Sequence, residues 1–439
     1  MHDKRSDISG FHKLSVEERL AKVSEFSGLA PEDSAILKKA GRLDLETAGR
    51  MIENVIGTAE LPLGVATNFL INGKDMLIPM ALEEPSVVAG ASYAAKLARP
   101  SGGFKTSADK PIMIGQIQLV KVKDPECAVK KILGAKRRLL EKCMQVDPML
   151  VKLGGGPKDI ETRIVAGIAG KMVIVHILVD VRDAMGANAV NTMTEHISAD
   201  LEQLSGGKAR AKIISNLAVH RLARAGAVWK KEDIGGPEAV DAIMEIYAMA
   251  EADAFRCATH NKGVMNGIDA VAIATGNDFR AVEAGMHAYA ARGGRYRPIT
   301  QYCRDKNGNL SGKIELPMAV GTIGGSIRTN PVAKTALRIL GVKTAQELAQ
   351  VMAAVGLAQN FAALRAIAVE GIQAGHMRLH SKNVAVAAGA KDEMIDKVAE
   401  IIYKEKKINI ERAKEVLCEF DGGKKTTNCR QLENEQNGG

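Results

Sequence analysis

The sequence predicts an α+β protein, in which a large and mostly helical domain is interrupted by a smaller domain of strands and helices. Three observations support this fold class. Between about residues 111 and 218, segments follow one another in the order β-α-β-β-α-β, which is that of a ferredoxin-like split motif. Helical periodicity dominates most of the remaining chain. Two further short helices are predicted at residues 391–406 and 410–420.

The N-terminal region is predicted to begin with two helices. Ser15 and Glu18 have the spacing of a capping box, which favours a helix at residues 15–26. A second helix is expected at residues 31–39, and Gly41 ends its pattern.

A hairpin and a third helix are predicted next. Asn72 and Gly73 lie between two apolar segments and suit the two positive-φ positions of a tight hairpin turn. Proline favours the first position of a helix, so we expect a helix at residues 85–99 that begins at Pro85. This places Glu84 at or next to the N-cap of that helix.

Six elements are predicted in the inserted domain, which we assign to residues 111–218. They are a strand at 112–122, a basic helix at 127–143, strands at 160–167 and 172–181, a helix at 187–204 and a strand at 211–217. Pro- and Gly-rich residues lie near the edges of this region. The large domain is then expected to be discontinuous and to comprise residues 1–110 and 219–374.

The C-terminal half carries two further helix-start signals. Asn277 and Asp278 could cap a helix that runs to about Arg292, and Thr344 with Glu347 forms another capping box. Helical periodicity then continues to about residue 370. The last residues, 421–439, are polar and rich in Gly and Asn, a composition typical of a disordered tail.

The composition is typical of a soluble globular protein, with 46% hydrophobic and 25% charged residues in a chain of 439. No apolar run approaches the ~20 residues that span a bilayer, and the charged N-terminus lacks the apolar core of a secretory signal. We therefore expect a cytoplasmic protein without a membrane partner. The cysteines have no metal-binding spacing and are expected to be reduced thiols: Cys127, Cys143, Cys257, Cys303, Cys418 and Cys429.

The formal net charge of +9 leaves three classes of partner open. They are nucleic acid, an anionic membrane surface and a polyanionic small molecule. A basic surface could equally serve solubility alone.

The usual cofactor and metal signatures are absent from the sequence. No GxGxxG follows a predicted strand, and neither GxxxxGK[ST] nor HExxH occurs. An ordinary Rossmann site and a P-loop are therefore not expected. What remains is a set of six polar or glycine-rich clusters at turns and helix starts, at residues 83–86, 183–188, 256–267, 275–278, 321–326 and 375–380.

Each cluster also has a purely structural explanation. Glu84 and Asp278 could be helix caps, and Lys262 could be a surface lysine. Residues 183–188 could form a simple turn, and the glycines of 321–326 could serve the close approach of two backbones.

His376 and His380 are four residues apart on a predicted helix and could bind zinc. No third ligand is evident in the sequence, so no metal is expected.

Together, the clusters resemble the 3-hydroxy-3-methylglutaryl-coenzyme A (HMG-CoA) reductase family, and most closely its class II form from bacteria and archaea. The matching stretches stand in the family's order and cover nearly the whole chain. They are ENVIGTAELPLGVATNFLINGKD at 53–75, EEPSVVAGAS at 83–92, DAMGAN at 183–188, ATHNKGVMNGID at 258–269, ATGNDFRAVEAG at 274–285 and GHM at 375–377. One departure is Ala59, where close relatives carry a larger residue.

The resemblance implies the reduction of the HMG-CoA thioester to mevalonate and free coenzyme A with two NAD(P)H, as in isoprenoid biosynthesis. It equally allows the reverse reaction in mevalonate catabolism. It also implies a homodimer, open to higher assembly, with the active site at the subunit interface. The substrate is expected on the large domain and the nicotinamide on the inserted one, with residues 375–420 forming a C-terminal flap.

The resemblance assigns four catalytic residues. Lys262 of HNKG would stabilise charge on the former carbonyl oxygen, and Glu84 of EEPS would protonate that oxygen. Asp278 of TGND would orient both side chains. His376 of GHM would protonate the coenzyme A thiolate. Glu83 and Asp278 are expected to raise the pKa of Glu84, while a helix N-terminus acts in the opposite direction.

Cofactor contacts map to Asp147, near the adenosine ribose, and to a run that follows a strand: Asp183, Ala184, Met185, Gly186, Ala187, Asn188 and Thr192. An acidic residue near the ribose accepts a hydrogen bond from a 2′-hydroxyl and repels a 2′-phosphate, which favours NADH over NADPH. A basic cluster could attract the phosphate instead: Lys130, Lys131, Lys136, Arg137 and Arg138.

Substrate contacts are expected from Arg256 and Asn266, on the carboxylate and hydroxyl side of HMG-CoA. Ser86 and His380 are further candidates. Coenzyme A carries several phosphate charges, which suits a basic protein.

Two other functions are compatible with parts of the sequence. A basic β-α-β-β-α-β domain resembles the topology of RNA-binding modules that stack bases on aromatic side chains. The predicted strands at 112–122 and 172–181 contain no aromatic residue, so no nucleic-acid partner is expected. The second alternative is an inactive acyl-CoA-binding regulator, which the complete set of four catalytic residues argues against.

Overall fold

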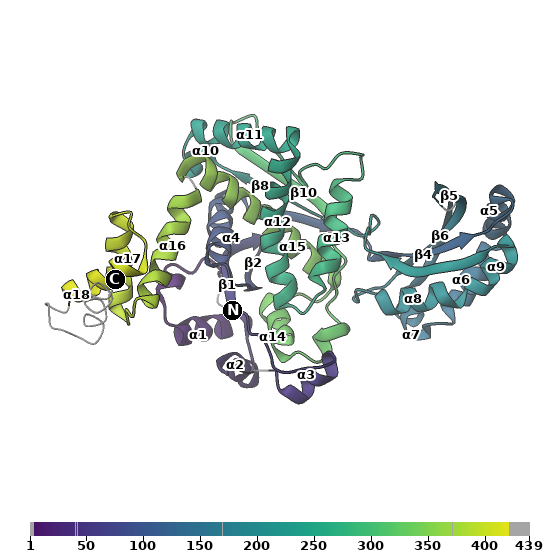
Figure 1. Ribbon diagram of the computed structural model, residues 1–439, viewed down its shortest axis with the longest axis horizontal. Coiled ribbons are helices and arrows are strands. Elements are labelled where there is room, and N and C mark those ends of the chain that lie inside the picture. The colour runs from purple at the N-terminus through teal and green to yellow at the C-terminus, as the bar shows by residue number, and fades with distance from the viewer. Residues whose placement is uncertain (1–3, 40, 42, 169, 371, 421–439) are drawn as a thin grey trace, which may run out of the picture. The chain divides into compact units, whose positions relative to one another are not determined.

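The structure is a computed structural model (Figure 1). It describes residues 4–39, 41, 43–168, 170–370 and 372–420, without the side chains of 370–379. The chain divides into two compact units. The first comprises Met1–Glu83 and Val87–Ala362, and the second comprises Glu84–Ser86 and Ala363–Gly439. The predicted tail at 421–439 lies outside the described residues, and the predicted domain boundaries stay a prediction.

The first unit begins with short helices whose caps are visible in the sequence. A 3-10 turn at Phe11–Lys13 is followed by α1 (Val16–Ser27), α2 (Pro31–Lys38) and α3 (Leu45–Met51). Ser15 accepts a hydrogen bond from the backbone of Glu18, and the Glu18 side chain accepts one from the backbone of Ser15. The predicted capping box is therefore confirmed.

The predicted hairpin is also confirmed. Strands β1 (Leu63–Ile71) and β2 (Lys74–Ala81) pair antiparallel and are joined by Asn72 and Gly73, whose φ angles are 50° and 80°. A Cβ atom makes positive φ costly, and Asn and Gly are the residues that tolerate it best.

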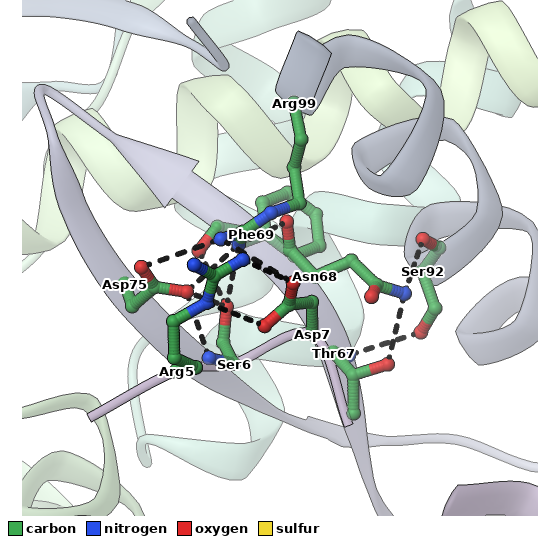
Figure 2. Close-up of polar contacts among 9 residues, drawn as sticks. All are labelled: Arg5, Ser6, Asp7, Thr67, Asn68, Phe69, Asp75, Ser92 and Arg99. Atoms are coloured by element: carbon green, nitrogen blue, oxygen red, sulfur yellow. Dashed lines mark hydrogen bonds and ion pairs between the residues drawn. The ribbon is translucent and has the colours of Figure 1, made fainter. Parts of the chain in front are cut away.

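A partly buried ion pair connects the N-terminal segment to this hairpin (Figure 2). Arg99 donates to Asp75 Oδ1 at 2.7 Å and to the hydroxyl of Ser6 at 3.2 Å. Burial acts to raise the pKa of Asp75, but the hydrogen bonds from Arg99 and Ser6 outweigh it and leave that pKa lowered. Segments far apart in sequence are thus held together by one charged cluster.

The large region contains a second sheet that the sequence analysis missed. Helix α4 (Pro85–Ala98) and a 3-10 turn at Arg99–Ser101 lead to a four-stranded sheet in the order β3-β8-β10-β9. Its strands are β3 (Lys105–Ala108), β8 (Leu222–Trp229), β9 (Thr300–Arg304) and β10 (Leu310–Pro317). The sequence analysis did not predict this sheet, because β3, β8 and β10 are short strands that pair over long sequence separations.

The core beside this sheet is centred on Trp229, the one tryptophan of the chain. It is fully buried, stacks on Phe361 at 3.9 Å between ring centroids, and donates from Nε1 to the carbonyl of Ala94. Phe361 lies on α15 (Ala345–Arg365) and Ala94 lies on α4, so one side chain ties two helices to the sheet.

A third sheet lies between residues 112 and 215 and has the order β5-β6-β4-β7 (Figure 1). Its antiparallel strands are β4 (Ile112–Val120), β5 (Gly156–Gly167), β6 (Gly170–Asp180) and β7 (Lys208–Ser215). Apolar side chains of its inner face, such as Val175 and Ile177, form a common core with the helices that cover it.

The helices of this region differ in detail from the expectation. The predicted helix at 127–143 is two helices, α5 (Pro125–Gly134) and α6 (Lys136–Met144), and the one at 187–204 is also divided, into α8 (Ala187–His196) and α9 (Ser198–Ser205). Helix α7 (Pro148–Lys152) was not anticipated. The breaks fall at Ala135 and Ile197, whose ψ angles of 3° and 0° depart from regular helical values.

The rest of the first unit is helical and carries the motifs of interest. Its helices are α10 (Lys231–Ile234), α11 (Pro237–Ala252), α12 (Ala254–Ala274), α13 (Phe279–Ala290), a 3-10 turn at Gly325–Arg328, α14 (Pro331–Leu340) and α15. One of the two hydrogen bonds of the predicted capping box at the start of α15 is confirmed, because the Thr344 hydroxyl accepts from the backbone N–H of Glu347. The Glu347 carboxylate accepts from the backbone N–H of Lys343 and not from that of Thr344.

One described helical stretch, Ala345–Val369, is long and apolar enough to cross a membrane by length and composition alone. The expectation that no stretch reaches this length is therefore wrong. In the structure 67% of its apolar window is buried, as is usual for a helix at the core of a folded domain.

The second unit is a small helical assembly with its own core. A π-helical turn at Ala366–Glu370 leads to α16 (Ile372–Ala387), α17 (Glu393–Lys404) and α18 (Ile410–Phe420). Buried residues such as Val384, Ile402 and Val416 hold these helices together.

The expectation of six reduced cysteines is wrong at one position. Cys418, on α18, is disulfide-bonded. The free thiols are Cys127, Cys143, Cys257 and Cys303, and Cys429 lies outside the described residues.

Candidate functional site

Two predicted site residues lie on one face of the long helix α12. The helix begins at Asp253, whose Oδ2 accepts a hydrogen bond from the backbone of Arg256 at 2.9 Å. Lys262 and Asn266 are four residues apart and so lie one above the other on the helix surface. Lys262 is exposed and Asn266 is half-buried. Among the described residues neither side chain has a hydrogen-bond or ion-pair partner, so both are available to a ligand.

Arg256 occupies the first turn of the same helix and is half-buried. Burial lowers the pKa of its guanidinium, although Cys257 acts weakly in the opposite direction. No ion pair of this side chain occurs within the described part of the chain. A partly desolvated cation without a counter-ion is suited to an anionic ligand group.

Asp278 is the N-cap of α13. This confirms the structural explanation that the sequence analysis gave for this residue. Its Oδ1 accepts from the backbone of Ala281 at 3.2 Å and lies 3.4 Å from the guanidinium of Arg280. The side chain is 42% exposed. The cap fixes the carboxylate at the start of α13, which packs against α12.

Glu84 and Ser86 belong to the second unit. The backbone N–H and the hydroxyl of Ser86 donate to Glu84 Oε1 at 3.3 and 2.7 Å. His380 is exposed on α16, and the side chain of His376 on the same helix lies outside the described residues.

The run from Asp183 to Asn188 forms the junction between β6 and α8. The carbonyl of Asp183 accepts from the backbone of Thr322 at 2.8 Å, and its Oδ1 accepts from that of Ala345 at 2.9 Å. A Cβ atom on Gly321 would lie 2.8 Å from the backbone nitrogen of Met185. Gly321 therefore permits a close approach of two backbones. This is the structural role that the sequence analysis gave for the glycines of residues 321–326.

Arg221 is a residue of this junction that sequence reasoning missed. It is buried and donates to the carbonyls of Ala184, Met185 and Val320. Burial lowers the pKa of its guanidinium to about 10, although the charges of Asp180 and Asp183 act to raise that pKa. No local signal distinguishes this arginine from a surface one, because all three of its partners are distant in sequence.

The start of α8 has the features of an anion site. Gly186 precedes the helix with φ 99°, no side chain caps the first turn, and no acidic residue lies in it. The free N–H groups and the helix dipole at such a start favour a phosphate group. Asn188 and Thr192 are exposed on this helix, and the Thr192 hydroxyl donates to the carbonyl of Asn188.

Asp147 is the N-cap of α7, where Oδ1 accepts from the backbone of Leu150 at 2.9 Å. Within the described chain its Oδ2 makes no hydrogen bond. Two members of the nearby basic cluster are already paired, Lys136 with Asp159 and Arg137 with Glu141.

A cavity of about 620 Å³ lies near this region but includes none of the predicted site residues. It is lined by Lys110, Pro111, Ile112, Gly154, Lys158, Asp180, Arg182 and Gln346.

An exposed apolar segment follows α3. Residues 52–62 form neither helix nor strand, and Ile52 and Ile56 are 68% and 103% exposed. Leu61 is also exposed. Large aliphatic side chains grouped in this way are typical of a surface that is covered in an assembly.

Comparisons with known proteins identify relatives along the whole chain. The family model described as hydroxymethylglutaryl-coenzyme A reductase matches residues 15–381. A 3-hydroxy-3-methylglutaryl-coenzyme A reductase of Archaeoglobus fulgidus is 61% identical over 94% of both chains. A probable enzyme of the same name from Borreliella burgdorferi is 34% identical over 88% of both.

Solved structures agree with these sequence relatives. A 3-hydroxy-3-methylglutaryl-coenzyme A reductase from Streptococcus pneumoniae matches with a TM-score of 0.81 and 41% identity, over 94% of this chain and 99% of that one. A class II structure from the same organism, bound to NADPH in open conformations, matches with a TM-score of 0.80 and 42% identity. It covers 82% of this chain and 99% of its own.

Proposed function

Starting from the fact that this chain belongs to the class II hydroxymethylglutaryl-coenzyme A reductase family, we propose how its residues reduce HMG-CoA to mevalonate. The chain is an oxidoreductase that uses a nicotinamide cofactor, and its activity belongs to the mevalonate pathway. When bound, two molecules of NAD(P)H would each supply one hydride, the first to the thioester and the second to the aldehyde that follows.

Lys262 is assigned to the charge that develops on the substrate oxygen in both reductions. Its ammonium group is exposed, and within the described chain it has no carboxylate partner. A cation that is not already neutralised can stabilise the transition state more than the ground state. This availability on α12 is the single observation that carries the proposal.

Glu84 is assigned to the protonation of that oxygen. Its hydrogen bonds from Ser86 hold the carboxyl group in one orientation. In the acid role this group would hold a proton when the substrate is bound. Asp278, fixed by its cap at the start of α13, is assigned to orient Lys262 and Glu84 in the assembled site.

His376 is assigned to the proton that the departing coenzyme A thiolate takes up. The assignment rests on the GHM motif, and the flap at residues 375–420 is part of the same proposal. A histidine can carry such a proton at neutral pH.

Arg256 and Asn266 are assigned to the carboxylate and hydroxyl side of HMG-CoA. The half-buried, unpaired guanidinium of Arg256 supports this role. Ser86 and His380 are further contacts in the proposal, and the basic chain suits the phosphates of coenzyme A.

The cofactor is assigned to the start of α8 and to Asp147. The uncapped first turn after Gly186 suits the pyrophosphate, and the free Oδ2 of Asp147 suits a ribose hydroxyl. We favour NADH over NADPH, because two of the basic side chains that could bind a 2′-phosphate are already paired with carboxylates.

A homodimer with the active site at its interface completes the proposal. The exposed apolar segment at residues 52–62 is the surface that such an interface would cover. We place the enzyme in the cytoplasm. The direction of the reaction in the cell would depend on the ratio of oxidised to reduced cofactor.

A spectrophotometric assay with HMG-CoA and each reduced cofactor tests this function. We expect oxidation of cofactor that depends on HMG-CoA, with a higher kcat/KM for NADH than for NADPH. A clear preference for NADPH would contradict the role of Asp147. The absence of turnover with both cofactors would contradict the function itself.

A further inference from the structure

Two buried polar residues on α12 immediately precede Lys262 and are not used by the proposed mechanism. His260 and Asn261 are 1% and 0% exposed, whereas Lys262 is exposed. Successive residues of an α-helix are about 100° apart around its axis, so His260 and Lys262 point to nearly opposite sides. The contacts of the buried pair therefore decide which way the proposed catalytic cation faces.

His260 belongs to a closed ring of hydrogen bonds that joins α12 to β9 and α15. Its Nε2 lies 2.6 Å from the hydroxyl of Thr300 on β9. That hydroxyl donates to Oδ1 of Asn360 on α15 at 3.1 Å, and Asn360 Nδ2 donates to the carbonyl of His260 at 3.1 Å. Tyr302 adds a second donor to Asn360 Oδ1, at 2.9 Å. All four residues are at most 5% exposed, so water does not compete for these bonds.

The ring also fixes where each proton lies. A backbone carbonyl can only accept, so Asn360 directs its amide nitrogen towards His260 and its oxygen towards Thr300. Thr300 has one hydroxyl proton, which goes to that oxygen, and the imidazole must therefore be the donor to Thr300.

The imidazole of His260 is neutral, with its one proton on Nε2. A second proton on Nδ1 would be buried without an acceptor, because this atom has no hydrogen-bond partner within the described residues. Burial, and to a smaller extent the charge of Arg256, lowers the pKa of His260 to about 3, which agrees with this state. The direction of every hydrogen bond in the ring is then determined.

Asn261 holds α12 to the segment that leads into β9. Its Nδ2 donates to the carbonyl of Arg297 at 2.9 Å, and its Oδ1 accepts from the backbone of Ile299 at 2.9 Å. Two consecutive side chains thus bind α12 to residues 297–300, at points about 100° apart around the helix.

Helices α12 and α15 also approach each other closely at two glycines. A Cβ atom on Gly267 of α12 would lie 3.2 Å from the carbonyl oxygen of Val355, and one on Gly356 of α15 would lie 2.7 Å from Cδ1 of Ile268. This packing leaves α12 little room to move towards α15. Rotation about its own axis is the displacement that the polar contacts must prevent.

We propose that His260 is a positioning residue for the reduction, which fixes the rotation of α12 through Thr300 and Asn360 and so sets the direction of Lys262. A side-chain group roughly 6 Å from a helix axis shifts by about 2 Å when the helix turns by about 20°. Misplacement of a reacting group by about 1 Å can cost on the order of 100-fold in rate. This inference rests on the proposed role of Lys262.

Replacement of Thr300 by Val tests the ring at its centre. The substitution keeps the shape of the side chain and removes the hydroxyl that links His260 to Asn360. We expect kcat to fall about tenfold or more with both HMG-CoA and mevaldehyde, because Lys262 is assigned to both reductions. KM for NADH should stay within about twofold of the wild-type value, because the proposed cofactor site is not on α12. Thr300→Ser keeps the hydroxyl and should recover most of the lost kcat.

Thr335→Val is the matched control for a merely structural effect. Thr335 on α14 is also fully buried, and its hydroxyl contacts Asp33 and the carbonyl of Pro331. Its replacement should lower the stability to denaturant as the Thr300→Val substitution does, but it should leave kcat unchanged.

Two substitutions of His260 give a second comparison if Thr300→Val does not fold. The side-chain amide of His260→Gln can donate from about the position of the imidazole Nε2, so kcat should stay within about threefold of the wild type. The amide of His260→Asn is one bond shorter and cannot reach Thr300 in the same way, so kcat should fall about tenfold or more.

Nitrogen NMR of histidine side chains gives a readout that stability alone would not move. In protein labelled with ¹⁵N-histidine, the signals that are missing from His260→Gln identify His260. We expect a neutral ring with its proton on Nε2 at neutral pH. A proton on Nδ1 alone, or a charged ring, would overturn the hydrogen-bond directions on which the inference depends.

The kinetic outcomes separate this inference from the proposed function. A folded Thr300→Val variant with the wild-type kcat, or equal losses of kcat in Thr300→Val and Thr335→Val, would overturn the positioning role of His260 while leaving Lys262 intact. A Lys262→Ala variant with the wild-type kcat would instead remove the premise, whichever nitrogen of His260 carries the proton.

Discussion

Two carboxylates with proposed roles in the site also cap helices. Asp278 and Asp147 are N-caps of α13 and α7, and the sequence analysis gave a capping explanation for Asp278. Capping is compatible with the proposed roles, because a cap uses one oxygen and fixes where the other points. A cap at a motif residue is therefore not an argument against a role in catalysis.

Replacement of His376 by Gln should separate the two reductive steps. The thiolate needs a proton only when HMG-CoA is the substrate, so we expect thioester reduction to fall by about 100-fold or more. Reduction of free mevaldehyde should be little affected. Initial rates with both substrates measure this, and equal losses in the two assays would contradict the thiolate role.

Replacement of Asp269, on α12, by Asn should change how stability depends on pH. Because the pKa of Asp269 is raised in the folded state, the folded protein keeps a proton that the unfolded chain loses above about pH 4. Its contribution to stability is thus complete below that pH and is lost as the pH rises to about 8. The asparagine variant should gain in Tm over the wild type, and more at pH 8 than at pH 5.

Thermal unfolding followed by circular dichroism at both pH values gives this comparison. A gain that is equal at the two pH values would show that Asp269 titrates alike in the folded and unfolded chains.

At the scale of elements, local signals predicted local structure. Ser15 with Glu18 and Asn72 with Gly73 act within a few residues, and both features are present as expected. The sheet β3-β8-β10-β9 and the contacts of Arg221 join distant segments, and neither alternation nor capping residues indicate such pairing.

Arg221→Met should loosen the junction between β6 and α8. It leaves buried carbonyls at Ala184, Met185 and Val320 without a donor, which should cost about 2–4 kcal/mol of unfolding free energy. Because the start of α8 is the proposed cofactor site, KM for NADH should rise more than KM for HMG-CoA.

Denaturant unfolding and initial rates measure both effects. Arg210→Met, at an exposed position on β7, is the matched control and should change neither. A destabilised Arg221→Met variant with an unchanged KM for NADH would disconnect this junction from cofactor binding.

At the scale of the whole molecule, the family and its reaction followed from motifs spread over nearly the entire chain. The catalytic assignments follow from the same motifs, but the single chain holds Lys262 and Asp278 in one unit and Glu84 and His376 in the other. Sequence patterns do not specify how these residues would meet in the proposed homodimer. The motifs therefore predict the components of the site better than its geometry.

Ile56→Asp should weaken the proposed homodimer. A charge in the exposed apolar segment at 52–62 is tolerated in a lone chain but costly in a covered interface. Light scattering should show a lower mass at micromolar protein, and activity should fall in parallel. Met249→Asp, also at an exposed apolar position, should retain the wild-type mass. An Ile56→Asp protein of wild-type mass and activity would place the interface elsewhere.

The central claim is that the Lys262 ammonium group stabilises charge on the substrate oxygen in both reductions. The most direct measurement is cofactor oxidation by Lys262→Ala with HMG-CoA and, separately, with mevaldehyde, beside the exposed-lysine control Lys334→Ala. We predict that both activities of Lys262→Ala fall by at least about 100-fold with the fold intact, while the control is unaffected. Substantial activity of Lys262→Ala with either substrate would contradict the claim.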